Sequence, residues 1–381
     1  MYKKFSFFLT LVLLLSLLPI SSAAVSDKAP FDVNADSAVL MDYNTGTVLY
    51  AKNADLALPP ASVTKIMTLL LIMEEVDSGN LSLSEEVSVS EYAASMGGSQ
   101  VYLEPGETMQ AEELLKCVII ASANDAAVTL AEKVAGSEEA FVARMNERAA
   151  ELGMNNTHFE NVTGLDDDTT SHLTSAYDIA LMSRELISHP TILKYSTIWM
   201  DSIRDGAFGL TNTNRLIRFY NGATGLKTGS TSKAGFCISA TAEREGLHLI
   251  AVIMGSDTRD IRNEAARQLL DYGFANYSIY TSEGGSAGEA SVMGGIKDTC
   301  GTEYPPFSIL LPKGKGKNVT TEVLIPEGIK APIQKGDRVG SVKYFLDGAV
   351  IAEFPVLASE NVDKIGFFGI FEKMLGIYLL K

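Results

Sequence analysis

Strand-like and helical segments follow a definite order in the first part of the chain, and this order restricts the fold. Residues 37–51 form two β-rich runs around an Asn-Thr-Gly turn, which predicts a hairpin. Residues 62–76, 111–134 and 175–188 carry apolar side chains at helical spacing. Residues 236–256 are again β-rich on both sides of a Glu-Gly turn. We therefore expect an α+β domain with strands at both ends and helices between them.

A change in composition near residue 282 marks the end of this domain. The segment 282–289 is rich in Ser, Gly and Glu, and short β-like runs separated by Gly, Pro and Lys follow it to about residue 358. A chain of 381 residues has room for two or three domains of roughly 150 residues each. We assign residues 25–281 to the α+β domain and residues 282–360 to a separate, small all-β domain.

The N-terminus has the pattern of an export signal. Met1-Tyr-Lys-Lys4 is basic, the run from Phe5 to Leu18 is apolar, and Ser21-Ser-Ala-Ala24 offers small residues for cleavage. This order is typical of a secretory signal peptide, and the apolar run is too short to span a bilayer comfortably. Residues 1–24 are therefore predicted to be a signal peptide and the mature protein to be exported.

The last segment, residues 361–381, predicts an amphipathic helix that lies on a membrane surface. Lys364, Glu372 and Lys373 interrupt any continuous membrane-spanning run. Packing of the helix on its own domain is the alternative, but an apolar face with several Phe side chains at the end of the chain favours the membrane. The residues at helical spacing are Ile365, Phe368, Phe371, Leu375, Tyr378 and Leu379.

Charge and ligand-type residues argue against several functional classes. With 31 Lys and Arg against 47 Asp and Glu, the formal charge of −16 opposes binding to nucleic-acid phosphates, so no nucleic-acid partner is expected.

The cysteines and histidines indicate neither disulfides nor a metal site. The three cysteines, Cys117, Cys237 and Cys300, are odd in number and widely spaced, so no disulfide framework is predicted. The histidines lack metal-site spacing, and we interpret each as a surface or loop residue. They are His158, His172, His189 and His248.

Three short motifs in the α+β domain carry the chemistry. Ser62-Val-Thr-Lys65 lies near a predicted helix start, where a spacing of three residues puts hydroxyl and amine on one face. A desolvated, neutral lysine could take the serine proton, because burial and nearby cations lower a lysine pKa. Ser122-Ala-Asn124 adds a second hydroxyl and an amide within a buried-looking stretch. Lys227-Thr-Gly-Ser230 adds positive charge and a strand edge.

Each motif alone is weak, because similar sequences occur elsewhere. Ser230-Thr-Ser-Lys233 is a second Ser-x-x-Lys sequence, and Ser78-Gly-Asn80 and Ser359-Glu-Asn361 repeat the Ser-x-Asn pattern. A lone Ser122-Ala-Asn124 would equally fit a helix kink or cap. Position separates them: the second Ser-x-x-Lys directly follows Lys-Thr-Gly, residues 78–80 fit the polar end of the first helix, and residues 359–361 lie beyond the β-rich domain.

In this order the motifs resemble those of the serine acyltransferases that include penicillin-binding proteins and class A β-lactamases. More closely, the chain is similar to D-alanyl-D-alanine carboxypeptidases of the low-molecular-mass, type-5 penicillin-binding group, peptidase family S11. The similarity covers nearly the whole mature chain, including the final helix. Beyond the short motifs, the matching segments are 58–68, 121–126, 164–166, 174–178, 225–231 and 331–340.

The resemblance implies a β-lactamase/transpeptidase-like domain, in which helices and a helical subdomain cover an antiparallel sheet. A β-sandwich-like domain and an interfacial helix on the outer face of the cytoplasmic membrane would follow. The implied reaction is hydrolysis of the terminal D-Ala-D-Ala bond of the peptidoglycan pentapeptide stem through an acyl-serine intermediate. The resemblance also implies acylation by β-lactam antibiotics and no metal or organic cofactor.

Roles for individual residues follow from the same resemblance. Ser62 would be the acylated nucleophile and Lys65 its general base. Ser122 would pass a proton toward the leaving D-alanine, and Asn124 would bind the substrate amide. The N–H groups of Ser62 and Ser230 would form the oxyanion hole. The other implied substrate-binding residues are Lys227, Thr228, Gly229 and Arg262. Lys227, Thr228 and Arg262 would help bind the terminal carboxylate of the substrate.

Some alternatives remain open at the level of the sequence. Arg259 lies close to Arg262, and a surface arginine is the other interpretation of either. Thr163 stands where relatives commonly carry His before Gly-Leu, so that loop lacks an imidazole. A class A-like β-lactamase is one rival function, although Glu160 does not have the sequence context of that enzyme's loop. A noncatalytic cell-wall-binding protein is the other, and the complete set of motif residues argues against it.

Overall fold

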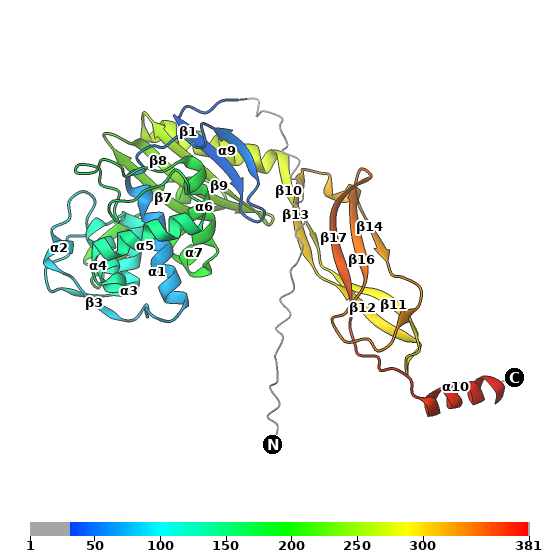
Figure 1. The fold of residues 1–381 in the computed structure, drawn as a ribbon. Helices are drawn as coiled ribbons and strands as arrows, with labels where there is room; N and C mark the ends of the chain where they lie inside the picture. Colours follow the sequence, from blue (N-terminus) through cyan, green and yellow to red (C-terminus); the bar gives the residue numbers. More distant parts are fainter. Residues whose placement is uncertain (1–30, 380–381) are drawn as a thin grey trace, which may run out of the picture.

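The computed structural model describes residues 31–379, so the predicted signal peptide lies outside the described residues. A larger domain of helices and sheet is followed by a narrower β domain, and helix α10 (Phe367–Leu379) lies at the far end of the β domain (Figure 1). This arrangement confirms the predicted α+β domain, all-β domain and terminal helix.

The larger domain is built on a five-stranded sheet in the order β2-β1-β9-β8-β7. The predicted hairpin is present as β1 (Ser37–Asp42) and β2 (Val48–Lys52). Strand β1 pairs with β9 (Leu247–Ser256), and β8 (Gly235–Arg244) lies between β9 and β7 (Ala223–Thr231). All these pairings are antiparallel. The strand that carries Lys227 is therefore an edge strand of the sheet.

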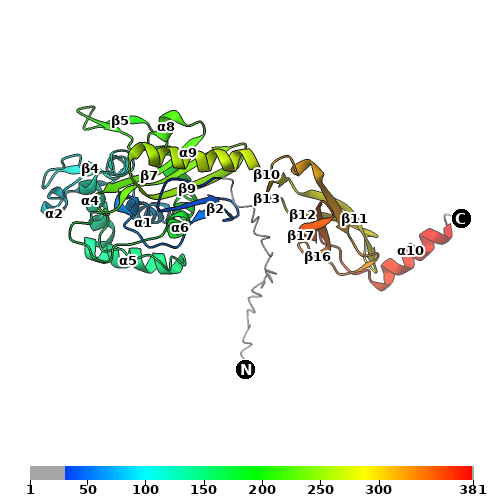
Figure 2. The same cartoon turned by 90° about the horizontal axis from the view of Figure 1, so that it is seen from above.

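Both faces of this sheet are covered by helices. Val252 packs in a core with α1 (Lys65–Asp77) and α6 (Ala176–Ile187), whereas its neighbour Ile253 packs in a second core with α9 (Arg259–Asn276). Figure 2 shows α9 on one side of the sheet and α1 and α6 on the other. Since successive side chains of a strand point to opposite faces, a strand covered on both sides is apolar over a continuous run, as residues 249–254 are.

The predicted interruption of the helices near Ser122 is present. Helix α3 (Ala111–Lys116) runs into a π-helical turn, Cys117–Ala121, and α4 (Asn124–Ala135) begins three residues after that turn. Ser122, at the end of the turn, has a left-handed backbone with φ of 63°. Such a conformation is uncommon for a residue with a Cβ and is found at functional sites.

Short elements complete the larger domain. Two of them are small two-stranded antiparallel sheets: β3 pairs with β4, and β5 pairs with β6. Their bounds and those of the remaining helices are β3 (Glu86–Ser88), β4 (Thr108–Gln110), β5 (Met200–Ile203), β6 (Phe208–Thr211), α2 (Glu91–Ala94), α5 (Glu138–Glu151), α7 (Pro190–Ser196) and α8 (Leu216–Phe219).

The second domain is a six-stranded sheet entered through a two-stranded ribbon. Strand β10 (Tyr277–Ser282) follows α9 directly and pairs with β13 (Phe307–Pro312). The ring of Phe307 lies 4.3 Å from that of Tyr344, which joins the ribbon to the core of the domain. In sheet order the six strands are β14 (Val319–Leu324), β16 (Arg338–Leu346), β17 (Ala349–Ala358), β12 (Thr299–Tyr304), β11 (Gly285–Met293) and β15 (Ile329–Lys330).

The terminal helix is shorter than the predicted 361–381. It begins at Phe367, because the residues before it are bridged to the β domain, Val362 to Ile333 and Lys364 to Gly295. Phe368 is 82% exposed on the helix, whereas Val362 is fully buried. The side chains of the predicted face beyond Leu375 lie outside the described residues. Within residues 31–379, no helix has the length and hydropathy needed to cross a bilayer.

The interpretation of each histidine as a surface or loop residue was wrong for His248, which lies within strand β9. His172 does lie in a loop, as expected. Both are buried, and burial lowers the pKa of each imidazole to about 4. His172 lies 2.8 Å from Thr64 Oγ1 and accepts the Glu160 N–H at Nδ1, so it is a neutral structural group beneath the start of α1. The partners that permit its burial are remote in sequence, and the sequence pattern did not indicate them.

Candidate active site

The Ser-x-x-Lys motif lies at the entrance to α1. A 3₁₀ turn, Ala61–Thr64, leads directly into the helix, and Lys65 is the first α-helical residue. Lys65 Nζ lies 3.0 Å from Ser62 Oγ, so the predicted pair is confirmed as a contact. The serine lines an open pocket, whereas the lysine has no exposed surface.

Two further oxygens contact the Lys65 amine. Nζ donates to Asn124 Oδ1 at 2.5 Å and to the Thr163 carbonyl at 2.8 Å. Burial, and then the positive charge of Lys227, hold the pKa of Lys65 well below its ordinary value. The environment of this amine therefore favours its neutral form.

The second serine is held by the lysine of the third motif. Lys227 Nζ donates to Ser122 Oγ at 2.8 Å and to the Thr228 carbonyl at 2.9 Å. Burial, and then the nearby charge of Arg262, lower the pKa of Lys227 to about 7. Both lysines of the site thus have depressed pKa values, a pattern that clusters at functional sites.

Gly229 allows strand β7 to approach the backbone at Ser62. A Cβ atom at position 229 would lie 2.8 Å from Ser62 N and 2.9 Å from the Pro60 carbonyl oxygen, closer than real Cβ contacts. Only glycine leaves room for this contact. The Lys-Thr-Gly motif therefore brings Ser230 beside the turn that carries Ser62, and both line the same pocket.

Asn124 connects the lysine to the neighbouring loop. Its Oδ1 accepts from Lys65, its Nδ2 donates to the Gly97 carbonyl at 2.7 Å, and its backbone N–H donates to the Ser99 carbonyl. Asp125 extends this anchoring by accepting the N–H of Val101. Asn124 positions the amine and fixes a wall of the pocket, while its predicted contact with a substrate amide remains a prediction.

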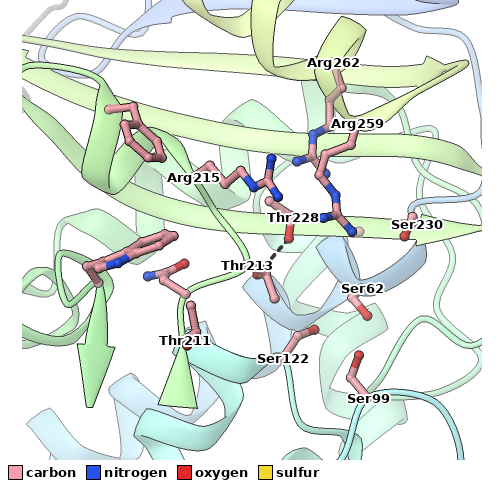
Figure 3. A pocket seen from close by; sticks show the side chains of 14 residues that line it. Ser62, Ser99, Ser122, Thr211, Thr213, Arg215, Thr228, Ser230, Arg259 and Arg262 are labelled. Atoms are coloured by element: carbon pink, nitrogen blue, oxygen red, sulfur yellow. Dashed lines mark hydrogen bonds between the residues drawn. The ribbon is translucent and has the colours of Figure 1, made fainter. Parts of the chain in front are cut away.

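These residues surround a pocket of about 560 Å³ (Figure 3). Six predicted site residues line it: Ser62, Ser122, Thr228, Gly229, Ser230 and Arg262. The amines of Lys65 and Lys227 are buried and contact the two serines Ser62 and Ser122. Thr228 Oγ1 donates to Thr213 Oγ1 at 2.8 Å across the strand edge. The lining residues that the sequence did not assign to the site are Ser99, Trp199, Thr211, Asn212, Thr213, Arg215, Phe219 and Arg259.

The competing motifs have other contacts. Lys233 donates to the Asp166 carbonyl, so the second Ser-x-x-Lys sequence does not pair its amine with Ser230. Ser78 is the C-cap of α1, as its position predicted. The Glu160 carboxylate accepts from the Thr170 and Ser171 N–H groups and is absent from the pocket lining. Among residues 31–379, no group of three or more His, Cys, Asp or Glu side chains is placed to hold a metal ion.

Comparisons with known proteins place this chain in a family. A family model described as D-alanyl-D-alanine carboxypeptidase matches residues 23–258, and one described as penicillin-binding protein 5, C-terminal domain, matches residues 281–364. The D-alanyl-D-alanine carboxypeptidase DacF of Bacillus subtilis is 43% identical over 374 residues, 96% of each chain.

Two solved structures extend the comparison. Penicillin-binding protein 5 of Haemophilus influenzae superposes with a TM-score of 0.74 at 31% identity, over 88% of this chain and 99% of that one. Penicillin-binding protein D2 of Listeria monocytogenes, in its ampicillin-bound form, superposes with a TM-score of 0.59 at 33% identity, over 65% of this chain and all of that one. The protein belongs to the D-alanyl-D-alanine carboxypeptidase family, S11, with the C-terminal domain of penicillin-binding protein 5.

Proposed function

We propose that this chain is a serine-type carboxypeptidase that removes the terminal D-alanine from peptidoglycan pentapeptide stems. Ser62 is the nucleophile, and the acyl chain of the substrate is held on its Oγ until water releases it. The single observation that carries this mechanism is the set of contacts around the Lys65 amine. Family membership and the relatives' names support the reaction, and the contacts of the site support the roles of the residues.

Lys65 is suited to be the general base because its hydrogen-bond partners leave the nitrogen lone pair facing Ser62. A neutral amine has two N–H donors and one lone pair. Asn124 Oδ1 and the Thr163 carbonyl are positioned to accept the two protons. The lone pair then faces Ser62 Oγ, 3.0 Å away, and can accept the hydroxyl proton as Oγ attacks the scissile carbonyl.

Departure of D-alanine requires a proton on its nitrogen. As the C–N bond breaks and the Ser62 ester forms, the leaving amine takes a proton from the Ser122 hydroxyl, and the proton that Lys65 accepted from Ser62 replaces it. Lys227 holds the Ser122 oxygen at 2.8 Å for this transfer. The left-handed backbone of Ser122 fixes the hydroxyl at the end of the π-helical turn.

Strand β7 supplies the electrostatic part of the mechanism. The close packing at Gly229 favours a site in which the N–H groups of Ser62 and Ser230 donate to the developing oxyanion. Thr228, which is bonded to Thr213, and the buried Arg262 lie where the terminal carboxylate would be received. Water then hydrolyses the acyl-serine ester, with Lys65 again accepting a proton.

The same serine would be acylated by β-lactam antibiotics. The Listeria protein in its ampicillin-bound form supports this partner, since it is related over the domain that carries the motifs. The mature chain would be exported to the outer face of the cytoplasmic membrane. There α10 would lie in the membrane surface through exposed apolar side chains such as Phe367, Phe368 and Phe371.

Mass spectrometry and D-alanine release test the function together. The wild-type protein should release D-alanine from an acylated D-Ala-D-Ala peptide and form a persistent penicilloyl adduct on Ser62. Ser62→Ala should lose both properties, while Ser78→Ala, at the end of α1 and outside the pocket, should keep both. Rapid turnover of penicillin would favour the β-lactamase alternative, and an adduct on Ser230 would overturn the choice of nucleophile.

A further inference from the structure

The active-site pocket carries more positive charge than a single D-alanine needs. Arg215, Arg259 and Arg262 all line it, and none of the lining residues is Asp or Glu. Figure 3 shows the three arginines on the same side of the pocket, Arg215 from the segment between β6 and β7 and the other two from α9. A leaving D-alanine brings one carboxylate to this cluster.

Arg262 differs from the other two arginines. It is 3% exposed, and its guanidinium donates to Asn263 Oδ1 at 2.8 Å and to the Cys237 carbonyl at 3.3 Å. Arg215 and Arg259 are exposed, and within the part of the chain that the structure describes neither side chain has a hydrogen-bond or ion-pair partner. The pKa of Arg262 is lowered to about 10, first by burial and then by the positive charges of Arg259 and Arg215. The three guanidinium groups are therefore close enough to repel one another. An anion bound between them would relieve this repulsion.

The position of the pair relative to the nucleophile indicates which part of a substrate it meets. Thr228 and Arg262, which would receive the terminal carboxylate, lie on the leaving-group side of Ser62. Arg215 and Arg259 lie on the same side of the pocket as these two residues. The pocket of about 560 Å³ is larger than one alanine requires, so the leaving residue could carry a longer side chain.

We propose that Arg215 and Arg259 bind a second carboxylate on the leaving residue, so that the enzyme prefers a leaving D-amino acid that carries two carboxylates over a neutral isostere. This inference rests on the proposed function, because it assigns the leaving side of the same pocket. Arg262 and Thr228 hold the α-carboxylate, and the two exposed guanidinium groups hold the side-chain carboxylate. The pair determines specificity and takes no part in proton transfer.

A matched pair of peptides tests the proposal. Acylated D-Ala-D-Glu and D-Ala-D-Gln have leaving residues of nearly equal size and differ in one charge. The wild-type enzyme should show a kcat/KM about fivefold higher for the D-Glu peptide, the scale of a partly exposed charged pair. Arg215→Gln and Arg259→Gln should each lower this preference, and the double variant should bring the ratio to about one. High salt should reduce the wild-type ratio, because exposed charges are screened.

Arg267→Gln provides the control, because Arg267 lies on α9 outside the pocket and pairs with Glu264. It should keep the wild-type ratio. An equal rate for both peptides in the wild-type enzyme overturns the proposal, as does a preference that survives in the double variant. Release of D-alanine from D-Ala-D-Ala and acylation by penicillin are measured on the same preparations. Loss of both in the wild-type protein would count against the proposed function itself, whereas normal values with an unchanged ratio count against the arginine pair alone.

Discussion

Lys227 Nζ lies 2.8 Å from Ser122 Oγ, although the two residues are 105 positions apart in the chain. This contact joins the edge strand of the sheet to the π-helical turn of the helical subdomain. The pocket is therefore assembled from both halves of the larger domain, and its serine hydroxyls lie against two buried amines.

Replacing Lys65 with arginine should abolish acylation nearly as completely as Lys65→Ala. A guanidinium stays protonated at every accessible pH, so it has no lone pair for the Ser62 proton. We expect the rate of penicillin acylation to fall by at least about a hundredfold in both variants, the scale of lost general base catalysis. Stopped-flow fluorescence or timed mass spectrometry measures the rate. Acylation of Lys65→Arg at a near-normal rate would move the base role to another group.

Gly229→Ala should disable the site while a matched glycine change does not. The added Cβ would lie 2.8 Å from Ser62 N, so strand β7 or the nucleophile turn must move. We expect a loss of roughly a hundredfold or more in acylation rate, because small displacements of reacting groups are costly. Gly209→Ala, on β6, meets open space and should retain the rate. Equal acylation rates for the two variants would contradict the close packing described for Gly229.

Substrate binding should depend on the protonation of Lys227. Its pKa is about 7, so its positive charge is present below that pH and is lost as the pH rises through it. If this charge attracts the terminal carboxylate, KM for a D-Ala-D-Ala peptide should rise as the pH increases above about 7. Arg262→Gln removes a neighbouring positive charge and should move the inflection to higher pH. An inflection that stays in place in that variant would exclude Lys227 as its source.

The motif residues could be predicted because their chemistry follows local spacing. Ser62 and Lys65 are three positions apart at a helix start, and the polar interruption at Ser122 was visible within an apolar stretch. The family resemblance then supplied the order of the motifs. Thr213 and Arg215 were not predicted, since a polar segment between a hairpin and a strand has no pattern of its own. Their place in the site results from the packing of β7 against its surroundings.

Burial of single polar residues was the other feature that the sequence did not predict. His172 is buried because Thr64, 108 positions away, and the Glu160 N–H satisfy its ring nitrogens. The spacing of residues along the sequence does not indicate that His172 contacts Thr64 and the Glu160 N–H. The start of the terminal helix was likewise placed too early, because the apolar residue Val362 belongs to the β domain and its side chain is buried there.

Acid should destabilise the protein through His172 and His248. Each imidazole has a pKa of about 4 in the folded chain, against about 6.5 when unfolded. The unfolded state therefore binds more protons below about pH 6.5, and stability falls progressively as the pH drops from there toward 4. We expect a destabilisation on the order of 3 kcal/mol from each residue once the pH has fallen to about 4. His172→Gln should reduce the slope of unfolding free energy against pH in this window, and an unchanged slope would contradict the role of that residue.

Membrane attachment should depend on the aromatic side chains of α10. Phe368 is 82% exposed and Phe371 is 57% exposed, so both are available to enter a lipid surface. Burying an aromatic side chain is worth roughly 1.5–3 kcal/mol, more than the ~1 kcal/mol of a lysine near an anionic surface. Phe368→Ser with Phe371→Ser should therefore weaken vesicle binding more than Lys364→Gln with Lys373→Gln.

Flotation of the exported protein with vesicles measures this difference. Lys373 already donates to Asp298 Oδ1 at 2.5 Å, which leaves it less able to act as a lipid contact. Deleting residues 361–381 should give a protein that stays with the soluble fraction and still hydrolyses a small D-Ala-D-Ala peptide, because the catalytic groups all lie in the larger domain. Action of the truncated enzyme on intact wall should fall through lost proximity. If the truncated protein still floats, or if the lysine changes alone release the full-length protein, attachment does not depend on the aromatic face.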